Sequence, residues 1–510
     1  MKKEMDLPKW MLLAVTLVMS LQSSAQLVFS GQYRTRSEFR SGQGTLPVQG
    51  SVPTFFTDSR LRLNIGYTTD RLKFFTSIQD VNTWGQNAST ISNMNGNTLS
   101  LHEAYAEVQL NDSTFLKNID YIGFKVGRQE IAYDDQKLLG SLDWLQQARS
   151  HDAIILRFAE KSWKADAGFA FNQSKENKNS GTVYSGVPTS QLGPDGTNLA
   201  SPAGTNGIGT MYKAMQYLYV SKEFGFTKAT FLLFNDDFQK TGAVAGTFQR
   251  GVNARTTVGV SVFGTIIRKH KIEGSFYYQG NKDKIGRTMD GYMASLSTQF
   301  AVGRKLMTGP GADYLSGNNT LDSTSTVNRS FDPLYGTPHK FWGFMDYFNA
   351  ADAYGFQATT GAGQNKMSPG LINVYWKSKY RLRDNLILTL DIHEFFAGNK
   401  VANRSTSSMT DQMNPRLGTE IDIVLNYNLT KVIGFELGYS HMFATSTMAA
   451  LKAPGGNYQK NLSGDWAYFM INIRPDFAGM INTGIADLKK GLNELSKKVT
   501  ILEQAQTPQN

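Results

Sequence analysis

The side chains in this sequence best suited to bind an anion are arginines spaced two residues apart. They occur as Arg34 and Arg36, with Arg40 four residues further on, and again as Arg60 and Arg62. A guanidinium keeps its charge at any physiological pH and can donate two parallel hydrogen bonds to one carboxylate. Residues at this spacing share one face of a β-strand. The arginines therefore predict a path or a binding site for anionic solutes, provided that they lie on strands.

The segments that carry these arginines alternate at period two. In the stretch 58–67, Leu61 and Leu63 share one face while Arg60 and Arg62 share the other, and a helix would scatter both sets. Blocks of about ten residues with this pattern recur from 27 to 474, as expected of membrane-spanning strands. The blocks cover 33–40, 58–67, 72–80, 101–110, 122–131, 153–159, 165–172, 216–222, 228–236, 255–264, 270–279, 292–302, 305–309, 371–381, 386–393, 418–427, 434–443 and 466–474.

The connectors between the blocks support a membrane barrel independently, because long connectors alternate with short ones. The long ones lie near 41–56, 83–99, 132–150, 174–213, 310–368, 398–416 and 447–464, and the short ones include 68–70, 160–161, 223–225, 382–385 and 429–431. Outer-membrane barrels have long external loops and short periplasmic turns, whereas a soluble propeller or sandwich has no reason to alternate them. The sequence predicts an all-β fold, a transmembrane antiparallel β-barrel of about eighteen strands.

The first 25 residues have the pattern of a secretory signal peptide. Lysines precede an apolar run from Trp10 to Leu21, and small side chains end the segment at Ala25. The run is shorter than the roughly 20 residues that a helix needs to cross a bilayer. We expect residues 1–25 to be the signal peptide, 26–477 to form the barrel in the bacterial outer membrane, and 478–510 to form a short C-terminal periplasmic helix.

The composition of the chain limits the classes of molecule that it is expected to bind. It has 510 residues, no cysteine and a formal net charge of +10. The lack of cysteine excludes disulfides, thiolate metal sites and a lipid-acceptor cysteine. The basic excess favours an anionic saccharide, small anions or lipopolysaccharide in the outer-membrane lipid, and not nucleic acid, which an exported protein rarely meets.

The tail after the last block changes from period two to a heptad pattern. Its apolar residues, spaced alternately by four and three, are Ile481, Ile485, Leu488, Leu492, Leu495, Val499 and Leu502. This pattern indicates a helix that mediates a homo-oligomer or docks a periplasmic partner through 481–502. A surface helix packed on the periplasmic rim of the barrel is an equal alternative.

The face opposite the apolar residues of each block gives the residues expected to line the pore. The basic set, assigned to anion selectivity, is Arg34, Arg36, Arg40, Arg60, Arg62, Lys125, Arg128, Arg157, Lys377, Lys379, Arg381 and Arg474. The lumenal acids are Glu38, Glu103, Glu107, Asp166, Asp391, Glu420, Asp422 and Glu436. Such residues can select anions and release them again. The alternative is that they form salt-bridge ladders that stiffen the wall.

Arg128 breaks the alternation, because strict parity places it with Phe124 and Val126 on the lipid face. A charge there costs about 2–4 kcal/mol near the bilayer midplane. Either the strand bulges at Gly127 and turns Arg128 inward, or Arg128 lies above the apolar band. We favour the bulge.

The sequence gives little support for a metal, a cofactor or catalysis. His102-Glu103 and His393-Glu394 lack the second histidine of a helical zinc motif and lie in strand patterns. Ser150, His151 and Asp152 are adjacent on one strand, so they cannot converge as a triad. The sequence therefore predicts that the protein has no metal site, uses no cofactor and is not an enzyme.

One long stretch resembles a known family of outer-membrane proteins. Residues 127–153, GRQEIAYDDQKLLGSLDWLQQARSHDA, resemble the alginate export family, and 31–36 (GQYRTR) and 334–346 (LYGTPHKFWGFMD) look like weaker signatures of it. The resemblance covers about 30–475. It implies an eighteen-stranded barrel with an arginine-lined lumen that, in founding members, passes an anionic uronic-acid polysaccharide outward.

These observations predict an outer-membrane channel for anionic polysaccharide or small anionic solutes. A general diffusion porin without a polysaccharide role is the alternative from the same fold. A barrel enzyme such as a lipase or protease is disfavoured, because only six histidines are available to it.

The heptad tail makes the first testable prediction. If residues 481–502 join copies of the chain or dock a partner, deleting 479–510 will change the oligomer size or the set of co-purifying proteins while the barrel still folds. Sedimentation of the detergent-solubilised protein and analysis of its partners measure this. An unchanged sedimentation profile and partner list would leave only the rim-packed helix.

Overall fold

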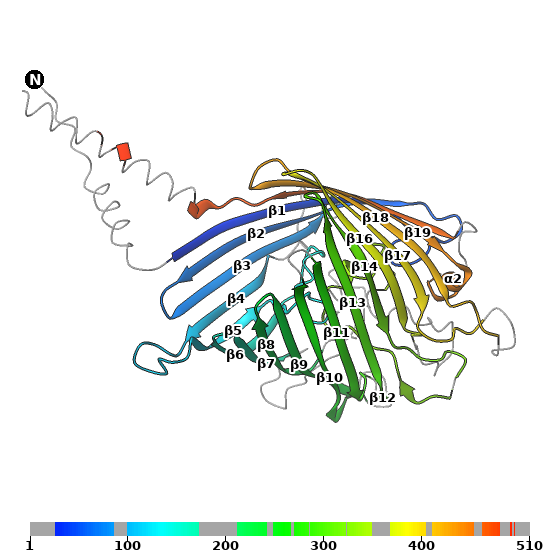
Figure 1. Ribbon diagram of the computed structural model, residues 1–510, viewed down its shortest axis with the longest axis horizontal. Helices are drawn as coiled ribbons and strands as arrows, with labels where there is room; N and C mark the ends of the chain where they lie inside the picture. The colour runs from blue at the N-terminus through cyan, green and yellow to red at the C-terminus, as the bar shows by residue number, and fades with distance from the viewer. Residues whose placement is uncertain are drawn as a thin grey trace, which may run out of the picture.

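The computed structural model describes residues 26–85, 99–172, 212–241, 248–266, 270–284, 286–322, 324–348, 368–403, 411–452, 462–479, 490–491 and 494. Within them, one antiparallel sheet contains eighteen strands (Figure 1). These are β1 (Gln26–Ser41), β2 (Thr54–Thr68), β3 (Leu72–Thr83), β4 (Ser100–Gln109), β5 (Tyr121–Gln129), β6 (His151–Glu160), β7 (Trp163–Phe171), β8 (Ala214–Phe224), β9 (Thr227–Thr241), β10 (Phe248–Ile266), β11 (His270–Asn281), β13 (Gly291–Val302), β14 (Leu306–Leu315), β16 (Leu371–Arg383), β17 (Leu386–Ala397), β18 (Arg416–Asn428), β19 (Ile433–Ala444) and β20 (Ser463–Ile473).

The sheet closes into a barrel because its first and last strands pair. Each strand pairs with the strand before and after it along the chain, and β1 also pairs with β20, from Tyr33 opposite Ile473 to Ser41 opposite Asp465. A closed sheet leaves no strand edge, so its backbone N–H and C=O groups are satisfied between strands, as a hydrocarbon surrounding requires. The predicted all-β barrel of about eighteen strands is confirmed.

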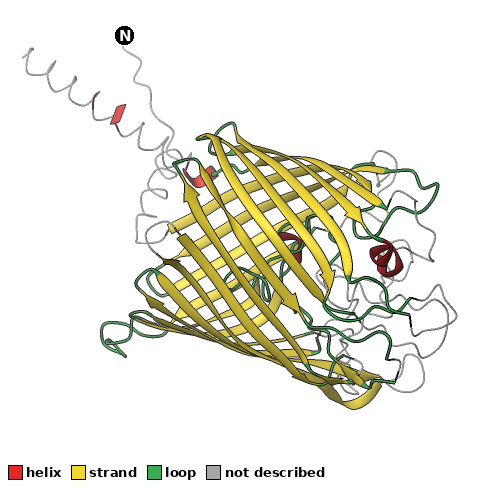
Figure 2. Ribbon diagram, turned by 45° about the vertical axis from the view of Figure 1, so that its right-hand side comes forward, coloured by secondary structure: helices red, strands yellow, loops and turns green. Residues whose placement is uncertain are grey.

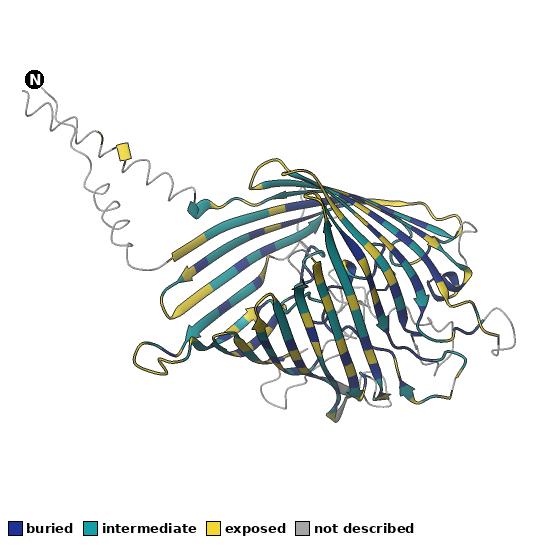
Figure 3. Cartoon of the chain, viewed as in Figure 1, coloured by how far each residue is buried: buried dark blue, intermediate teal, exposed yellow. Residues whose placement is uncertain are grey.

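Alternation along each strand separates an inner from an outer face, as Figure 3 shows by the alternating burial. In β2, Arg60 is 1% exposed and Arg62 is 9% exposed, whereas Leu61 between them is 52% exposed. Large apolar side chains on other strands are exposed in the same way, among them Leu156, Leu296 and Leu437. The outer face is therefore the apolar one, and the polar side chains of the strands turn inward.

The inner face is packed partly by tyrosines lying over glycines of the neighbouring strand. Gly168 is paired with Tyr217, and Gly438 is paired with Tyr468. A Cβ at either glycine would collide with the ring of its partner. Glycine is required here by the close approach of a ring, and this packing joins adjacent strands inside the barrel.

The connectors differ between the two ends of the barrel (Figure 2). Short turns such as 161–162 and 225–226 lie at one end, and the other end carries the long connectors. The connectors at that end hold the helix α2 (Ser446–Lys452), the 3-10 helix η2 (Pro338–Lys340), and the short strands β12 (Thr288–Met289) and β15 (Val327–Asn328), which pair with each other. No helix in the described part of the chain is long and apolar enough to cross a membrane.

Strand β14 is longer than its sequence pattern indicated. The predicted block ended at residue 309 and a long connector was predicted from 310, but the strand continues to Leu315. Pro310 has no N–H to donate to the ladder, and Gly311 is a glycine because the Tyr375 ring of β16 occupies the space of a side chain. The predicted signal peptide and most of the predicted tail lie outside the described residues.

Candidate functional site

Four arginines on two neighbouring strands form the main basic group of the barrel interior, and we call them the arginine cluster. Arg34 and Arg36 come from β1, and Arg60 and Arg62 come from β2. Arg34 lies directly opposite Arg60 in the register of the two strands. All four are buried, with Arg36 at 2% exposure. Because like charges opposite each other destabilise a sheet, this arrangement requires counter-charges.

One counter-charge comes from a connector that folds into the barrel. We call residues 130–150, between β5 and β6, the first inner connector. The carboxylate of Asp143 lies 2.8 Å from Nη1 of Arg60 and 3.3 Å from Nη1 of both Arg34 and Arg62. Three guanidinium groups thus converge on one carboxylate, whose side chain is still 48% exposed.

The arginine cluster also binds the backbone of the first inner connector. Arg34 donates to the carbonyl of Asp143 at 2.8 Å, Arg36 to the carbonyl of Trp144 at 2.6 Å, and Arg60 to that of Gln146 at 3.1 Å. Since hydrogen bonds from charged donors are worth about 1.5–3 kcal/mol each, these bonds hold the connector against the β1–β2 wall.

The second counter-charge is Glu38 on β1, whose side chain is fully buried. It lies 2.7 Å from Nε of Arg36 and 2.8 Å from Nη2 of Arg40, and it accepts a hydrogen bond from the indole of Trp466 at 2.8 Å. Trp144 lies against the same group, because Arg36 stacks on its ring at 4.1 Å. The predicted lumenal acid is therefore a structural partner of two arginines.

A second long segment enters the barrel and meets the first. We call residues 329–348 the second inner connector; Tyr335 forms a parallel bridge with Leu139 of the first. Arg149 donates to the carbonyls of Tyr335 and Gly336. The two connectors thus form one packed unit inside the barrel.

Buried ion pairs fix this unit to the opposite wall. Arg255 of β10 pairs with Asp236 of β9 at 2.6 Å and with Asp332 of the second inner connector at 2.7 Å. Lys137 of the first inner connector pairs with Asp313 of β14 at 3.2 Å. Removing one partner of such a pair leaves a buried charge, at a cost of about 3–5 kcal/mol.

Two of the remaining predicted basic residues of the wall, Arg157 and Lys377, are paired with predicted acids. Arg157 lies 2.9 Å from Glu107 and 3.8 Å from Asp166. Lys377 lies 3.1 Å from Asp391. Lys125 instead stacks on the Tyr105 ring of the neighbouring strand at 3.7 Å. These pairs form salt-bridge ladders along β4 to β7 and β16 to β17. Three further predicted basic residues are exposed near the strand ends opposite the long connectors, and they are Lys379, Arg381 and Arg474.

The other predicted acids support the second inner connector or the wall. Glu420 is fully buried and accepts the backbone N–H of Met345 at 2.7 Å. Asp422, two residues further along β18, is 1% exposed and lies 3.9 Å from His393. Glu436 accepts the hydroxyl of Tyr468 at 2.6 Å. Glu103 lies beside Glu130 at the start of the first inner connector.

The predicted inward turn of Arg128 is wrong. The pairing of β5 with β6 runs without a register shift through Gly127, so Arg128 stays on the outer face. Its side chain is 44% exposed and lies 2.8 Å from Asp152 of β6, which also faces outward. Arg128 is the last residue but one of β5, at the end with the long connectors. Its charge is compensated by Asp152 close to the end of the strand.

A cavity of about 380 Å³ lies between the inner connectors and the wall formed by β9 to β16. Its lining carries both charges, from Lys228, Lys340, Lys377, Asp134, Asp135 and Glu273. Sequence reasoning missed Asp134, Asp135 and Asp143, because residues of a connector have no period that assigns them to a face. The one available signal was their place in the stretch 127–153.

Comparisons with known proteins agree with this architecture. Residues 25–187 match the model of a family described as alginate export. The predicted family resemblance is confirmed. No curated protein matches the chain in sequence.

Solved structures show the same fold. Pseudomonas aeruginosa OccK8 (OprE) is 11% identical, with 88% of this chain and 98% of that chain covered and a TM-score of 0.52. Pseudomonas aeruginosa OccK5 (OpdH) is 10% identical over 88% and 98%, and Acinetobacter baumannii OccAB2 is 10% identical over 89% and 98%, each with a TM-score of 0.52. The chain is a bacterial outer-membrane β-barrel with the architecture of a channel.

Asp143 gives a prediction about acid stability. Burial alone would raise the pKa of its carboxyl, but Arg60, Arg34 and Arg62 outweigh this and lower the pKa below its usual 3.8. Its contribution to the free energy of unfolding is therefore complete above about pH 4 and is lost as the pH falls through the lowered pKa.

The variant Asp143→Asn should lower the free energy of unfolding at neutral pH by about 1.5–3 kcal/mol, the range of hydrogen bonds to charged groups. It should also make the free energy of unfolding fall less steeply as the pH is lowered, because the variant has no carboxyl at this position to protonate. Unfolding of detergent-solubilised protein followed across the acid range measures both. Asp384→Asn, in the exposed turn between β16 and β17, is the matched control. An equal loss in both variants would contradict the assignment.

Proposed function

We propose that this outer-membrane channel passes anionic saccharides or small organic anions, and that the arginine cluster provides the preference for anions. The observation that carries the proposal is the binding of the Asp143 carboxylate by Arg34, Arg60 and Arg62. A uronate carries the same carboxylate group, and planar guanidinium groups suit it in the same way. The interior therefore already contains a working carboxylate site, occupied by a residue of the chain itself.

The charge balance around the cluster supports the same proposal. In the part of the chain that the structure describes, Arg34, Arg36, Arg40, Arg60 and Arg62 form ion pairs with two carboxylates, Glu38 and Asp143, so the ion-paired group has a formal excess of three positive charges. Among the described residues, Nε of Arg60 and Nη2 of Arg62 have no hydrogen-bond partner. Unused donors and excess positive charge favour a further anion in this part of the lumen.

A general diffusion porin is the second candidate, and the cavity supports it. Its lining mixes lysines with aspartates and a glutamate, so it has no single sign of charge. A channel whose narrowest part lay there would discriminate weakly between anions and cations. In the first candidate, passage is controlled on the side of the inner connectors that faces the arginine cluster. In the second, it is controlled on the side of the cavity. Substitution of the arginine cluster therefore distinguishes the two candidates.

The quadruple variant with glutamine at Arg34, Arg36, Arg60 and Arg62 tests the proposal in planar bilayers. Removing four positive charges should lower the anion-to-cation permeability ratio, measured from reversal potentials in a salt gradient. It should also weaken the binding of uronate oligomers, about tenfold for each 1.4 kcal/mol by which the substitutions reduce the binding free energy.

The quadruple variant also detaches the first inner connector from the β1–β2 wall, because the same arginines bind its carbonyls. Asp143→Ala is therefore the matched control, since it loosens the connector but leaves all four arginines. It should raise the anion-to-cation ratio, the opposite direction. Ratios that stay unchanged in both variants would favour the general porin.

A further inference from the structure

A β-bulge places an imidazole and a carboxylate side by side at one edge of the barrel interior. In the pairing of β3 with β4, Ser77 is opposite Glu103, and the next residue, Ile78, is opposite Leu101. His102 is thus an extra residue without a cross-strand partner. A bulge of this kind re-aims a side chain that regular alternation would point outward. His102 is 4% exposed, although a regular strand would place it on the face opposite to Glu103.

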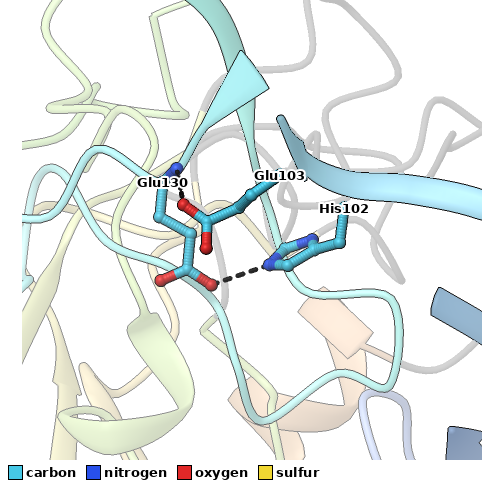
Figure 4. Close-up of side chains that lie close together, drawn as sticks. All are labelled: His102, Glu103 and Glu130. Atoms are coloured by element: carbon cyan, nitrogen blue, oxygen red, sulfur yellow. Dashed lines mark hydrogen bonds and ion pairs between the residues drawn. The ribbon is translucent and has the colours of Figure 1, made fainter. Parts of the chain in front are cut away.

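A third ligand group comes from the start of the first inner connector. Glu130 follows β5 directly, and its Oε1 lies 2.8 Å from Nε2 of His102. Its backbone N–H donates to Oε1 of Glu103 at 3.1 Å. One ligand atom from each of the three residues lies within 4.8 Å of the others (Figure 4). The two carboxylates and the ring converge on a common point, as the figure shows.

Two buried oxygens beside these groups have no partner among the described residues. One is Oγ of Ser77, which is 2% exposed and faces the same side of the sheet as its cross-strand partner Glu103. The other is Oε1 of Gln129, a fully buried residue next to Glu130. The Nε2 amide group of Gln129 donates to the carbonyls of Gly127 and Ala153, which orients the side chain so that its oxygen accepts no hydrogen bond from the described residues. A buried oxygen without a donor destabilises the fold unless something binds it.

We propose that His102, Glu103 and Glu130 bind one divalent cation, with the Ser77 hydroxyl as a further oxygen ligand. A cation there would relieve the repulsion of two neighbouring carboxylates and satisfy the unpartnered hydroxyl. One imidazole with two carboxylates suits Zn²⁺ or Mn²⁺, whereas Ca²⁺ and Mg²⁺ prefer oxygen ligands alone. Neither the family match nor the proposed anion path requires this site.

The cation would connect the bulge of β4 to the root of the first inner connector. Glu130 stands thirteen residues before Asp143 in the same connector, and the arginine cluster binds that connector further along. A metal bond at its root would reduce the conformations open to the connector. The expected consequence is that the metal stabilises the folded barrel as well as binding to it.

The test is titration of the full mature protein, purified in detergent without a polyhistidine tag and stripped with a chelator, using ZnCl₂, MnCl₂ and CaCl₂ separately. We expect one equivalent of Zn²⁺ or Mn²⁺ in calorimetry and metal analysis, weaker Ca²⁺ binding, and a higher unfolding temperature with the metal. The double variant His102→Ala, Glu130→Gln should weaken binding at least tenfold and abolish the temperature shift.

His270→Gln is the matched control, because His270 is an exposed histidine at the start of β11 and lies outside the cluster. It should bind the metal like the unchanged protein. Equal binding by the double variant, or the absence of any stoichiometric binding by the unchanged protein, would overturn the proposal. Ca²⁺ bound more tightly than Zn²⁺ and Mn²⁺ would overturn the ligand class. If the double variant fails to fold, Glu103→Gln takes its place, and binding unchanged in that variant would also overturn the proposal.

Discussion

The structure depends on one constraint: a sheet surrounded by hydrocarbon must close on itself, and it must send every second side chain to the inside. Closure through β1 and β20 satisfies the backbone, and alternation then gathers the polar side chains of all eighteen strands in the interior. On β1 and β2 this places Arg34 opposite Arg60. Like charges so close must be compensated, and the chain compensates them with a connector. The path of residues 130–150 is thus a consequence of the charge on the wall.

Of the three stretches predicted to resemble the alginate export family, 127–153 lies within the match at 25–187 and is largely the first inner connector, and 334–346 lies in the second. Residues 127–153 contain Asp143, and residues 334–346 contain Tyr335, whose bridge to Leu139 joins the two segments. They lie mostly between the membrane-spanning strands. The strands need only an apolar outer face, which many residues can supply, whereas the connectors bind specific charged groups. A specific motif is therefore found where the lumen is filled.

The strands and their faces could be predicted because period two is a local property of the sequence. The pairings within the site could not, since Arg60 and Asp143 are 83 residues apart, and Arg149 and Tyr335 are 186 apart. Local irregularities were the other limit. Arg128 suggested a bulge where the register is continuous, while the real bulge at His102 gave no signal, because His102 is an ordinary polar residue in an alternating block. The predicted strand at β14 also ended too early, at residue 309, because proline and glycine are uncommon inside strands and Pro310 and Gly311 follow.

The proposed binding of an anion at the arginine cluster would be coupled to the position of the first inner connector. Any carboxylate that binds Arg34, Arg60 and Arg62 competes with Asp143, since all three are within 3.3 Å of it. By linkage, a solute that binds more tightly when Asp143 is displaced must favour the displaced connector by the same factor. Displacing that carboxylate alone does not free the connector, because the bond from Arg36 to the carbonyl of Trp144 and the ion pair of Lys137 with Asp313 persist. The connector can therefore yield locally at the arginine cluster while remaining attached to both walls of the barrel.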